Sequence, residues 1–467
     1  MSALWTSADA AKATGGRLAG AAWAASGISI DTRTLKAGDL FVALKAEKDG
    51  HDFVRAAFAQ GAAAALVSRE IAASGPQLVV GDTLEALGQM GVAARARSKA
   101  RVVAVTGSVG KTSTKEGLAL VLGKQAATHA AAASFNNHIG VPVTLARMPS
   151  DSRYAVFEIG MNHAREIAPL TAMVAPHVAI VTTVEAVHAE YFPDGIDGVA
   201  RAKAEIFETG QGGETAVLPF DNRYFETLAK AAHLWNWRNV LSFGTQAGAD
   251  ARLIDWKGDA GGSTVTADFL GTRATWRVGA PGKHWALNSL AVLLGAHALG
   301  ADWRQAADAL ATAAPPKGRG ARHDVKLPGG GSFALLDESY NASPPSMRAA
   351  FAVLSMTDAK RRIAVLGDMR ELGPDAEALH AGLADAILAE KIDLVFCCGP
   401  LMRRLFDALP EDKRGAHTAD SAALQPIVLD AVRAGDAVSV KGSLGSRMGP
   451  IVDALLARGP QAAAAGR

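Results

Sequence analysis

One eight-residue run between an apolar strand and a helix constrains the fold of this chain more than any other feature. The segment Val102–Val105 has the length and composition of a buried strand, and Thr114–Leu122 has a helical pattern. Between them stand Thr106, Gly107, Ser108, Val109, Gly110, Lys111, Thr112 and Ser113. Glycines let backbone N–H groups turn toward an anion, and a helix N-terminus adds partial positive charge. The run therefore predicts a phosphate-binding loop.

The spacing of this loop departs from that of a standard P-loop. The standard spacing places its first glycine at position 105, where this chain has Val105. We interpret the run as a shortened variant, in which Lys111 reaches the outer phosphates of ATP and the Thr112 hydroxyl holds Mg²⁺. The alternative is an ordinary glycine-rich turn between a strand and a helix. The combination of strand, Gly-Lys-Thr and helix argues against that alternative, and we expect an ATP-using enzyme.

Apolar strands alternate with helical patterns along the chain, which predicts an α/β protein with parallel sheets covered on both faces. A length of 467 residues allows about three domains of about 150 residues each. We expect a small α/β domain over residues 1–98, a central P-loop-type parallel-sheet ATPase domain over 99–314, and a C-terminal Rossmann-like α/β domain over 315–467. The Pro- and Gly-rich stretch 315–320 is the predicted linker before the last domain.

Composition excludes several classes of protein. The chain has 48 basic and 46 acidic residues, a net charge of +2, which gives no reason to expect nucleic acid or a membrane surface as partner. It contains no apolar run long enough to span a bilayer and no secretory pattern at its N-terminus, so we expect a cytoplasmic protein without a membrane span. We also expect a monomer. Cys397 and Cys398 are adjacent and are predicted to be buried thiols, because sequence neighbours rarely reach disulfide geometry.

Two polar side chains follow predicted strands of the central domain, at the carboxyl ends where open parallel sheets bind ligands. Glu158 ends the strand that begins at Tyr154, and a carboxylate there is a natural Mg²⁺ ligand beside Thr112. Taken alone, a solvated strand-end carboxylate is the more common explanation. His188 follows the strand Val178–Thr182. Since most loop histidines are surface or hydrogen-bonding residues and Mg²⁺ prefers oxygen, the residues alone do not assign His188 to a metal.

Lys203 stands on an apolar helical face. In the predicted helix 196–208, its neighbours at helical spacing are Ile196, Val199, Ala200, Ile206 and Phe207. A buried lysine is rare unless paired, because its charge is expensive to desolvate. Either the side chain reaches solvent at the edge of the face, or it is neutralised or modified inside a site. Carbamylation by CO₂ would turn it into an anion able to bind metal.

These motifs together resemble the Mur ligases, the ATP-dependent amino-acid-adding enzymes of peptidoglycan precursor synthesis. The resemblance covers nearly the whole chain and includes the phosphate loop, Glu158, His188 and the stretch around Lys203. Its further motifs are Asn136-Asn137-His138-Ile139-Gly140-Val141-Pro142, Gly282-Lys283-His284 with Asn288, Gly318-Arg319-Gly320, and Lys441-Gly442-Ser443.

Within the family, two regions are similar to particular members. The segments 30–33, 38–44 and 49–53 resemble the UDP-binding domain shared by the third and fourth ligases of the pathway. The segments 337–344 and 367–373, with His380, resemble the member that adds D-alanyl-D-alanine to UDP-N-acetylmuramoyl-tripeptide. The chain lacks the Asp-Asn-Pro-Arg signature of diaminopimelate-adding relatives. It departs from the family at Glu338 and Ser343, where Asp and Asn are usual, and these departures leave the assignment intact.

The resemblance implies a role for each candidate residue. Lys111, Lys203 and His188 are the implied catalytic residues, with Lys203 carbamylated. The metal ligands it implies for two Mg²⁺ ions are Thr112, Glu158, His188 and Lys203. The ATP contacts it adds to the phosphate loop are Asn288, Arg319, Asp337 and Asn341. The substrate contacts it implies are Asn136 and Asn137 in the central domain and Asp31, Thr32, Arg33 and Lys45 near the uridine nucleotide.

The resemblance also implies a reaction in which the tripeptide carboxylate attacks ATP and the amine of the dipeptide then attacks the acyl phosphate. Three rivals stay open at this point. One is a related ligase, adding lysine or diaminopimelate or acting on folate, and the UDP-type first domain disfavours the folate enzyme. Another is a P-loop kinase or transport-coupled ATPase, which needs a Walker-B strand ending in Asp. The third is a non-catalytic nucleotide-binding scaffold, against which Lys111, Thr112, Glu158 and Lys203 argue.

Overall fold

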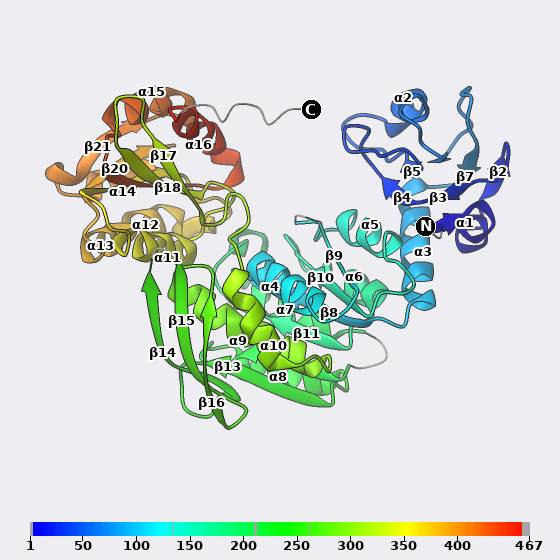
Figure 1. Cartoon of the computed structure of the whole chain (residues 1–467), viewed down its shortest axis with the longest axis horizontal. Coiled ribbons are helices and arrows are strands. Elements are labelled where there is room, and N and C mark those ends of the chain that lie inside the picture. Colours follow the sequence, from blue (N-terminus) through cyan, green and yellow to red (C-terminus); the bar gives the residue numbers. More distant parts are fainter. Residues whose placement is uncertain (1–2, 133, 210–212, 260, 460–467) are drawn as a thin grey trace.

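The computed structural model consists of three lobes, each built around its own β-sheet (Figure 1). It describes residues 3–132, 134–209, 213–259 and 261–459. We call residues 3–97 the first lobe, 101–312 the central lobe and 321–456 the third lobe. Within the described residues their main sheets have five, nine and six strands, and most neighbouring strands are parallel. The predicted α/β fold class is therefore confirmed.

The first lobe has a five-stranded sheet in the order β2-β7-β6-β5-β4, in which only β2 is antiparallel to its neighbour among the described strands. The strands β5 and β6 are buried along their whole length because helices cover both faces. The lobe contains β1 (Trp5–Thr6), α1 (Ser7–Thr14), β2 (Arg17–Ala19), β3 (Ala24–Ala25), β4 (Gly27–Ser29), β5 (Asp39–Val42), η1 (Gly50–Phe53), α2 (Val54–Ala59), β6 (Ala64–Val67), β7 (Gln77–Val79) and α3 (Thr83–Arg97).

The helix α3 joins the first lobe to the central lobe. It begins at Thr83 because the side chain of Asp82 accepts hydrogen bonds from the next two free backbone N–H groups. Its apolar side packs on α5 (Gly140–Ala146), and Val143 and Ala146 of that helix belong to the hydrophobic core of the first lobe. The indole of Trp5 donates a 2.8 Å hydrogen bond to the carbonyl oxygen of Ala146. Helix α5 of the central lobe therefore takes part in the core of the first lobe.

The central lobe has a nine-stranded sheet in the order β16-β15-β14-β13-β12-β11-β8-β10-β9. The strands from β9 to β14 in this order pair in parallel, and β15 and β16 extend one edge as an antiparallel meander. Its strands are β8 (Arg101–Thr106), β9 (Thr128–Ala130), β10 (Tyr154–Glu158), β11 (Val178–Val181), β12 (Thr215–Pro219), β13 (Asn239–Gly244), β14 (Ala251–Asp259), β15 (Gly262–Phe269) and β16 (Thr272–Val278).

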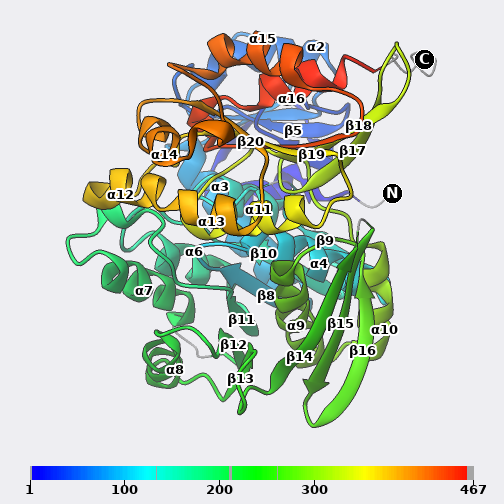
Figure 2. The ribbon, with the colours of Figure 1, turned by 90° about the vertical axis from the view of Figure 1, so that its left-hand side faces the viewer.

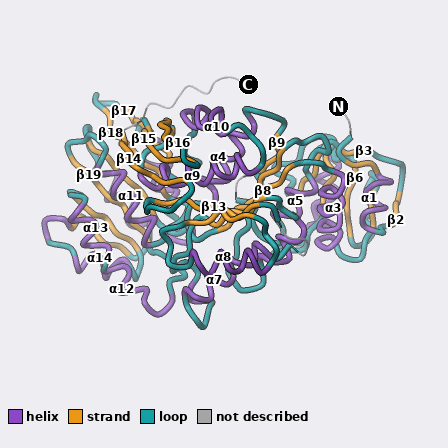
Figure 3. Tube along the Cα trace, turned by 90° about the horizontal axis from the view of Figure 1, so that it is seen from below, coloured by secondary structure: helices purple, strands orange, loops and turns teal. Residues whose placement is uncertain are grey.

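Helices cover both faces of this sheet, as Figure 3 shows with α4, α9 and α10 on one side and α7 and α8 on the other. The helices of the central lobe are α4 (Lys111–Gly123), α5 (Gly140–Ala146), α6 (Ile167–Val174), η2 (Ala189–Tyr191), α7 (Ile196–Ala204), η3 (Glu205–Phe207), α8 (Phe225–Leu234), α9 (Lys283–Ala298), α10 (Trp303–Ala309) and η4 (Leu310–Thr312). After β8, the chain continues to β9 and β10 on one side of that strand and then to β11 on the other. A crevice at the carboxyl end of β8 follows from this reversal of direction, and such crevices bind ligands.

The third lobe has a six-stranded sheet in the order β17-β18-β22-β19-β20-β21, parallel except for β17. Figure 2 shows this lobe, yellow to red, lying over the central lobe. It contains β17 (Ala321–Lys326), β18 (Ser332–Glu338), α11 (Pro344–Ser355), β19 (Arg361–Gly367), η5 (Gly373–Asp375), α12 (Ala376–Ala381), α13 (Leu383–Ala389), β20 (Leu394–Cys398), α14 (Met402–Ala408), η6 (Glu411–Lys413), β21 (Arg414–Thr418), α15 (Ser421–Ala431), β22 (Asp436–Lys441), η7 (Leu444–Ser446) and α16 (Gly449–Leu456).

Two further expectations can be compared with the fold. Over the described part of the chain, no helix combines the length and the apolar character needed to cross a bilayer. Cys397 and Cys398 are free and buried, as predicted, and burial raises the pKa of the Cys398 thiol to about 12. A thiol with so high a pKa is a poor nucleophile near neutral pH, so these cysteines have a packing role.

We expect Leu290→Ala to destabilise the central lobe, because Leu290 in α9 is fully buried in the core between the sheet and α4. Truncation of a leucine at such a position costs about 2–5 kcal/mol of unfolding free energy. The measurement is a urea titration followed by tryptophan fluorescence. Leu234→Ala is the control, since Leu234 is 77% exposed and its loss should leave the transition unchanged. Equal midpoints for the two variants would contradict the packing described for α9.

Candidate active site

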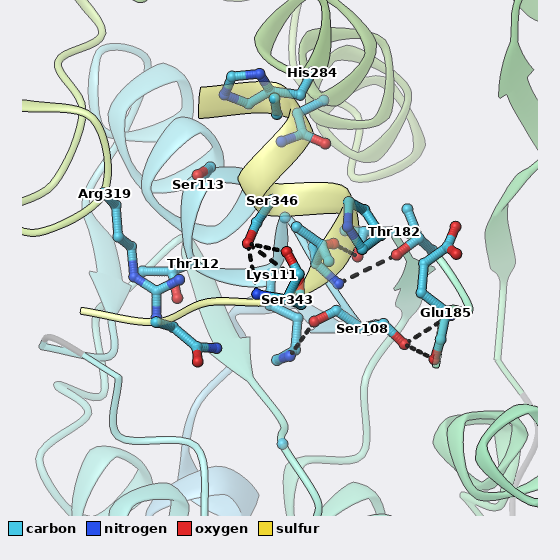
Figure 4. Close-up of a pocket in the computed structure, with 18 of the residues that line it drawn as sticks. Ser108, Lys111, Thr112, Ser113, Thr182, Glu185, His284, Arg319, Ser343 and Ser346 are labelled. Atoms are coloured by element: carbon cyan, nitrogen blue, oxygen red, sulfur yellow. Dashed lines mark hydrogen bonds between the residues drawn. The ribbon is translucent and has the colours of Figure 1, made fainter. Parts of the chain in front are cut away.

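A cavity of about 530 Å³ lies where the central lobe meets the third lobe. Its floor is the crevice at the carboxyl end of β8, with Ser108 to Ser113 and Glu158. Its opposite wall comes from the third lobe and the linker before it, including Arg319, Asn341 and Ser346. Figure 4 shows side chains from both lobes converging on this space. The cavity is therefore a site that neither lobe forms alone.

The predicted phosphate loop has the backbone geometry of an anion cradle. Gly107 and Gly110 have φ angles of +143° and +91°, which side chains other than glycine rarely adopt. A Cβ on Gly107 would also lie 1.9 Å from Oγ1 of Thr182, so no larger residue fits there. The helix α4 begins directly after Gly110, and its first N–H groups have no partner within the helix. Lys111 extends back over the loop and donates a 2.6 Å hydrogen bond from Nζ to the carbonyl oxygen of Gly107.

Residues after β11 hold this loop in place. The hydroxyl of Ser108 donates to the backbone oxygen of Glu185 at 3.1 Å and accepts from its backbone N–H at 2.9 Å. Thr182 donates a 2.5 Å hydrogen bond from Oγ1 to the carbonyl oxygen of Val109, and Figure 4 shows these contacts beside Lys111. The loop is thus fixed by the neighbouring strand before any ligand binds, which lowers the cost of binding.

Thr112 and Glu158 provide two buried oxygen atoms without partners. The hydroxyl of Thr112 and Oε2 of Glu158 make no hydrogen bond to any described residue, although both side chains are buried. The other oxygen of Glu158 accepts a 2.7 Å hydrogen bond from the amide of Asn136. Buried oxygens are rarely left unpaired in folded proteins, so these two point to a ligand. Oxygen is the donor that Mg²⁺ prefers, and this pair fits the ion.

In the described part of the chain, no three or more His, Cys, Asp or Glu side chains are grouped so that they could hold a metal ion by themselves. The Mg²⁺ sites of nucleotide-binding enzymes do not need such a group, because the ion keeps several waters and binds one or two protein oxygens together with substrate phosphates. Thr112 and Glu158 are therefore suited to a metal that arrives with a phosphate chain.

Lys203 is buried in the central lobe, with 2% of its surface exposed. It lies on α7 among Val199, Ala200 and Ala202, as the helical spacing predicted. The alternative in which it reaches solvent at the edge of the helix is therefore wrong. No hydrogen bond or ion pair to another described residue accompanies its ammonium. Desolvation, and next the charge of Lys111, lower the pKa of Lys203 well below its usual value, which favours the neutral amine.

His188 lines the cavity from the central lobe, in the loop after β11. Its φ angle is +63°, which is uncommon for a residue with a side chain. Its Nδ1 atom lies against a carboxylate oxygen of Glu371, a residue of the third lobe, without reaching hydrogen-bond geometry. The predicted metal role of His188 remains a prediction, and its partner across the lobe boundary is a feature that the sequence did not reveal.

The four residues predicted to contact ATP differ in position. Asn288, Arg319 and Asn341 line the cavity, and the guanidinium of Arg319 lies 4.5 Å from the ring centre of Tyr340. Asp337 is buried beneath the linker and does not line the cavity. Its carboxylate accepts hydrogen bonds from the backbone of Gly318 at 3.0 Å and from the backbone and hydroxyl of Ser339. It thus fixes the segment that carries Arg319, while its contact with ATP stays a prediction.

The residues predicted to contact the substrate fall into two groups. Asn136 lines the cavity and donates a hydrogen bond to Glu158. Asn137 instead accepts hydrogen bonds from the backbone N–H groups of Ile139 and Gly140 at the start of α5. The first-lobe candidates do not belong to the cavity wall, and Asp31 instead pairs with Arg33. Those candidates, whose roles stay predictions, are Asp31, Thr32, Arg33 and Lys45.

Lys441 and His284 line the cavity, although no role was predicted for either from the sequence; both belong to motifs quoted for the family. Lys441 is buried and donates to the carbonyl oxygen of Asn341 at 2.9 Å and to Glu338 at 3.3 Å. Burial and the charge of Lys441 lower the pKa of His284 to about 4, so its imidazole is neutral at physiological pH. Lys441 could have been predicted as a site residue because it stands at the carboxyl end of an apolar strand, as Glu158 does.

The phosphate loop, the open oxygen pair and the wall from the third lobe together define the site of an enzyme that uses ATP. Three family models match the chain: Mur ligase family, catalytic domain, over residues 24–97; Mur ligase middle domain over 105–296; and Mur ligase, glutamate ligase domain, over 329–444. The chain belongs to the Mur ligase family, and it is an ATP-dependent ligase.

Curated relatives and solved structures of one member resemble the chain over most of its length. A UDP-N-acetylmuramoyl-tripeptide–D-alanyl-D-alanine ligase of Escherichia coli is 36% identical, covering 95% of this chain and 96% of the relative. The ligase of the same name from Rickettsia prowazekii is 32% identical, covering 91% and 94%. A crystal structure of MurF from Acinetobacter baumannii has a TM-score of 0.83 at 30% identity, covering 97% and 99%. MurF ligase from Thermotoga maritima, solved in complex with ADP, has a TM-score of 0.76 at 25% identity, covering 92% and 97%.

Nucleotide binding is expected to take up a proton at alkaline pH. Burial lowers the pKa of Lys111 to about 8, and the negative charge of bound phosphates raises it again. At about pH 6.5 the ammonium is protonated both before and after binding, whereas near pH 9 the free site is mostly neutral and must gain a proton when ADP binds. Calorimetry of ADP binding in buffers of different ionisation enthalpy measures this uptake. In Lys111→Met, titrated at saturating ADP, the uptake should disappear, and an unchanged value would contradict the assignment.

Proposed function

We propose that this chain joins D-alanyl-D-alanine to UDP-N-acetylmuramoyl-tripeptide, using ATP and forming ADP and phosphate. The observation that carries the proposal is the cavity between the lobes. It combines the phosphate loop with the unpartnered oxygens of Thr112 and Glu158 and with a wall from the third lobe. The similar ligases of Rickettsia prowazekii, Escherichia coli and Bacillus subtilis are named for this reaction, which supports this choice of substrates. Such a reaction belongs to peptidoglycan precursor synthesis, and we expect it to be carried out by a cytoplasmic monomer.

The first step activates a carboxylate. The terminal carboxylate of the tripeptide attacks the γ-phosphorus of ATP, the bond to the β-phosphate oxygen breaks, and ADP leaves. Both reactants are anionic, so their approach needs positive charge in a site with little water. Lys111 supplies that charge at the phosphate loop, and the backbone N–H groups between Gly107 and Thr112 orient the phosphates. Asn288, Arg319, Asp337 and Asn341 are the proposed further contacts of the nucleotide.

Thr112 and Glu158 are the proposed protein ligands of Mg²⁺. When bound, the ion supplies Lewis-acid charge that neutralises the phosphate oxygens. The support is the pair of buried oxygens that lack a partner among the described residues. Asn136 holds the other carboxylate oxygen of Glu158, which orients this ligand. We further propose that Asn136 and Asn137 contact the tripeptide substrate in the central lobe.

Lys203 is the proposed site of carbamylation, and with His188 it forms the proposed second metal site. The neutral amine is the form that attacks CO₂, and burial together with the charge of Lys111 favours that form. The amine nitrogen bonds to the carbon of CO₂ and a proton leaves to water, so the side chain changes from a cation into an anion. The modification would relieve the like charge that Lys203 otherwise shares with Lys111.

The second step forms the amide. The amine of D-alanyl-D-alanine attacks the acyl carbon, the carbon–oxygen bond to phosphate breaks, and inorganic phosphate leaves while the amine loses a proton. Acyl phosphates hydrolyse in water, so the site must exclude solvent until the amine arrives. The third lobe is the proposed carrier of the dipeptide, and we propose that the C-terminal domain to which it belongs comprises residues 315–467. The uridine nucleotide is assigned to residues 1–98, with Asp31, Thr32, Arg33 and Lys45 nearest to it, and the activation step to residues 99–314.

Release of ADP should require both proposed substrates. The assay couples ADP to NADH oxidation in the presence of UDP-N-acetylmuramoyl-tripeptide, with and without D-alanyl-D-alanine. Turnover only when both are present supports the amide ligase. Steady ADP release without either substrate would indicate an ATPase, and no release with both would contradict the proposed substrates.

Lys203→Ala is expected to abolish ligation, because the anion that the carbamate provides is lost. Short aliphatic acids at millimolar concentration should restore part of the activity by occupying the place of the carbamate. The matched control is Lys230→Ala, since Lys230 is an exposed lysine on the next helix of the same lobe. Full activity of Lys203→Ala in buffer depleted of CO₂, without added acid, would contradict the modification.

A further inference from the structure

The third lobe contacts the central lobe beside the cavity through two short helical turns. η2 directly follows His188 in the central lobe, and η5 follows Glu371 in the third lobe. A Cβ built on Gly373 would lie 3.5 Å from Cα of Glu190, so the two turns face each other with room for little more than a methyl group between them. Figure 2 shows α12, which continues from η5, lying above α7, which follows η2. This contact therefore brings a loop of the third lobe to the edge of the candidate active site.

A carboxylate of the third lobe meets a cavity histidine at this contact. A carboxylate oxygen of Glu371 lies directly against Nδ1 of His188, although the two groups do not reach hydrogen-bond geometry in this structure, and the Glu371 and His188 side chains are only 35% and 20% exposed. Both residues have a φ angle of +63°, an unfavourable conformation for residues with side chains. Such conformations persist where the surrounding structure imposes them, and they concentrate at functional sites. The pKa of Glu371 lies below its usual value, chiefly because of its contact with His188.

The other ring nitrogen of His188 is left available. His188 lines the cavity, and no hydrogen bond between its Nε2 atom and another described residue is formed. A histidine that binds a metal commonly donates its second ring N–H to a carboxylate, which fixes the tautomer and the orientation of the ring. With a carboxylate at Nδ1 and a cavity beside Nε2, His188 and Glu371 have this arrangement.

We propose that Glu371 is a positioning residue that reaches across the lobe boundary. Its carboxylate accepts a hydrogen bond from Nδ1–H of His188, so that the lone pair of Nε2 faces the cavity. The inference rests on the proposed function, in which His188 faces the metal and the phosphates. It adds that the orienting carboxylate belongs to a different lobe. Docking of the third lobe then does two things at once: it brings the dipeptide-carrying lobe to the site, and it sets the tautomer of the histidine that serves the activation step.

The direct test is the tautomer of His188, read from long-range ¹H–¹⁵N correlations of the full chain with bound ADP. The His188 signal is assigned by its loss in His188→Gln. We expect the Nδ1–H tautomer in the unchanged protein and its loss in Glu371→Ala. The matched control is Glu377→Ala, because Glu377 lies in the same region but pairs with Arg404 within the third lobe. An identical tautomer with and without Glu371 would overturn the proposal. This readout needs no ligation, so it can fail while the proposed function stands.

A kinetic cycle provides the second test. Glu371→Ala should lower kcat by roughly 10- to 100-fold, the usual effect of removing a carboxylate behind a metal-binding histidine. Glu377→Ala should stay within about twofold. Because Glu371 acts through His188, the double variant with His188→Ala should be no slower than His188→Ala alone. Losses that multiply in the double variant would overturn the proposal. If Glu371→Ala does not fold, Glu371→Gln, which keeps the shape and removes the charge, replaces it in both tests.

Discussion

Lys111 and Lys203 both hold their amines away from bulk water in the central lobe, and the charge of Lys111 lowers the pKa of Lys203. Glu158 stabilises the charge of Lys111, but one of its own oxygens has no partner among the described residues. The Lys111 ammonium therefore has one carboxylate near it, and the negative charge of bound phosphates would stabilise that ammonium further. The glycine geometry and Lys111 suit a phosphate chain, and the open oxygens of Thr112 and Glu158 suit the cation that a phosphate chain brings with it.

The three lobes contribute unequally to this site. The first lobe packs on the central lobe through α3 and α5, and its core includes Val143 and Ala146 of α5. The third lobe is joined through the linker 313–320 and through the walls of the cavity, including the contact between Glu371 and His188. Opening and closing during catalysis are therefore expected between the central and third lobes, where the activated carboxylate must be shielded from water.

The local parts of the site were predictable from the sequence because their signals lie within a few residues. The strand, the glycine loop and the helix are contiguous, and the helical spacing around Lys203 indicated its burial. The long helix expected from His284 to Leu299 is α9, Lys283–Ala298. The strand expected at 253–256 is longer, because β14 pairs with both β13 and β15 and extends over Ala251–Asp259.

Contacts that form only when distant segments pack together could not be predicted from the sequence. His188 and Glu371 are 183 residues apart in the numbering, and no local pattern relates them. Lys441 reaches Asn341 only because β22 and β18 are neighbours in the third sheet. The position of Asp337 beneath the linker, rather than in the cavity wall, likewise depends on the turn at Gly318. The family resemblance assigned His188, Asp337 and Asn341 to a site but did not identify the atoms that they contact. It assigned no role to Glu371 or Lys441.

The most direct test of the central claim is the fate of oxygen from the carboxylate of the tripeptide. We predict that this carboxylate bonds to the γ-phosphorus and later leaves one of its oxygens on the phosphate. With both carboxylate oxygens labelled as ¹⁸O, mass spectrometry of the inorganic phosphate formed during ligation should find one ¹⁸O atom per phosphate. Phosphate without label, formed at the same rate as the amide, would contradict carboxylate activation at this site.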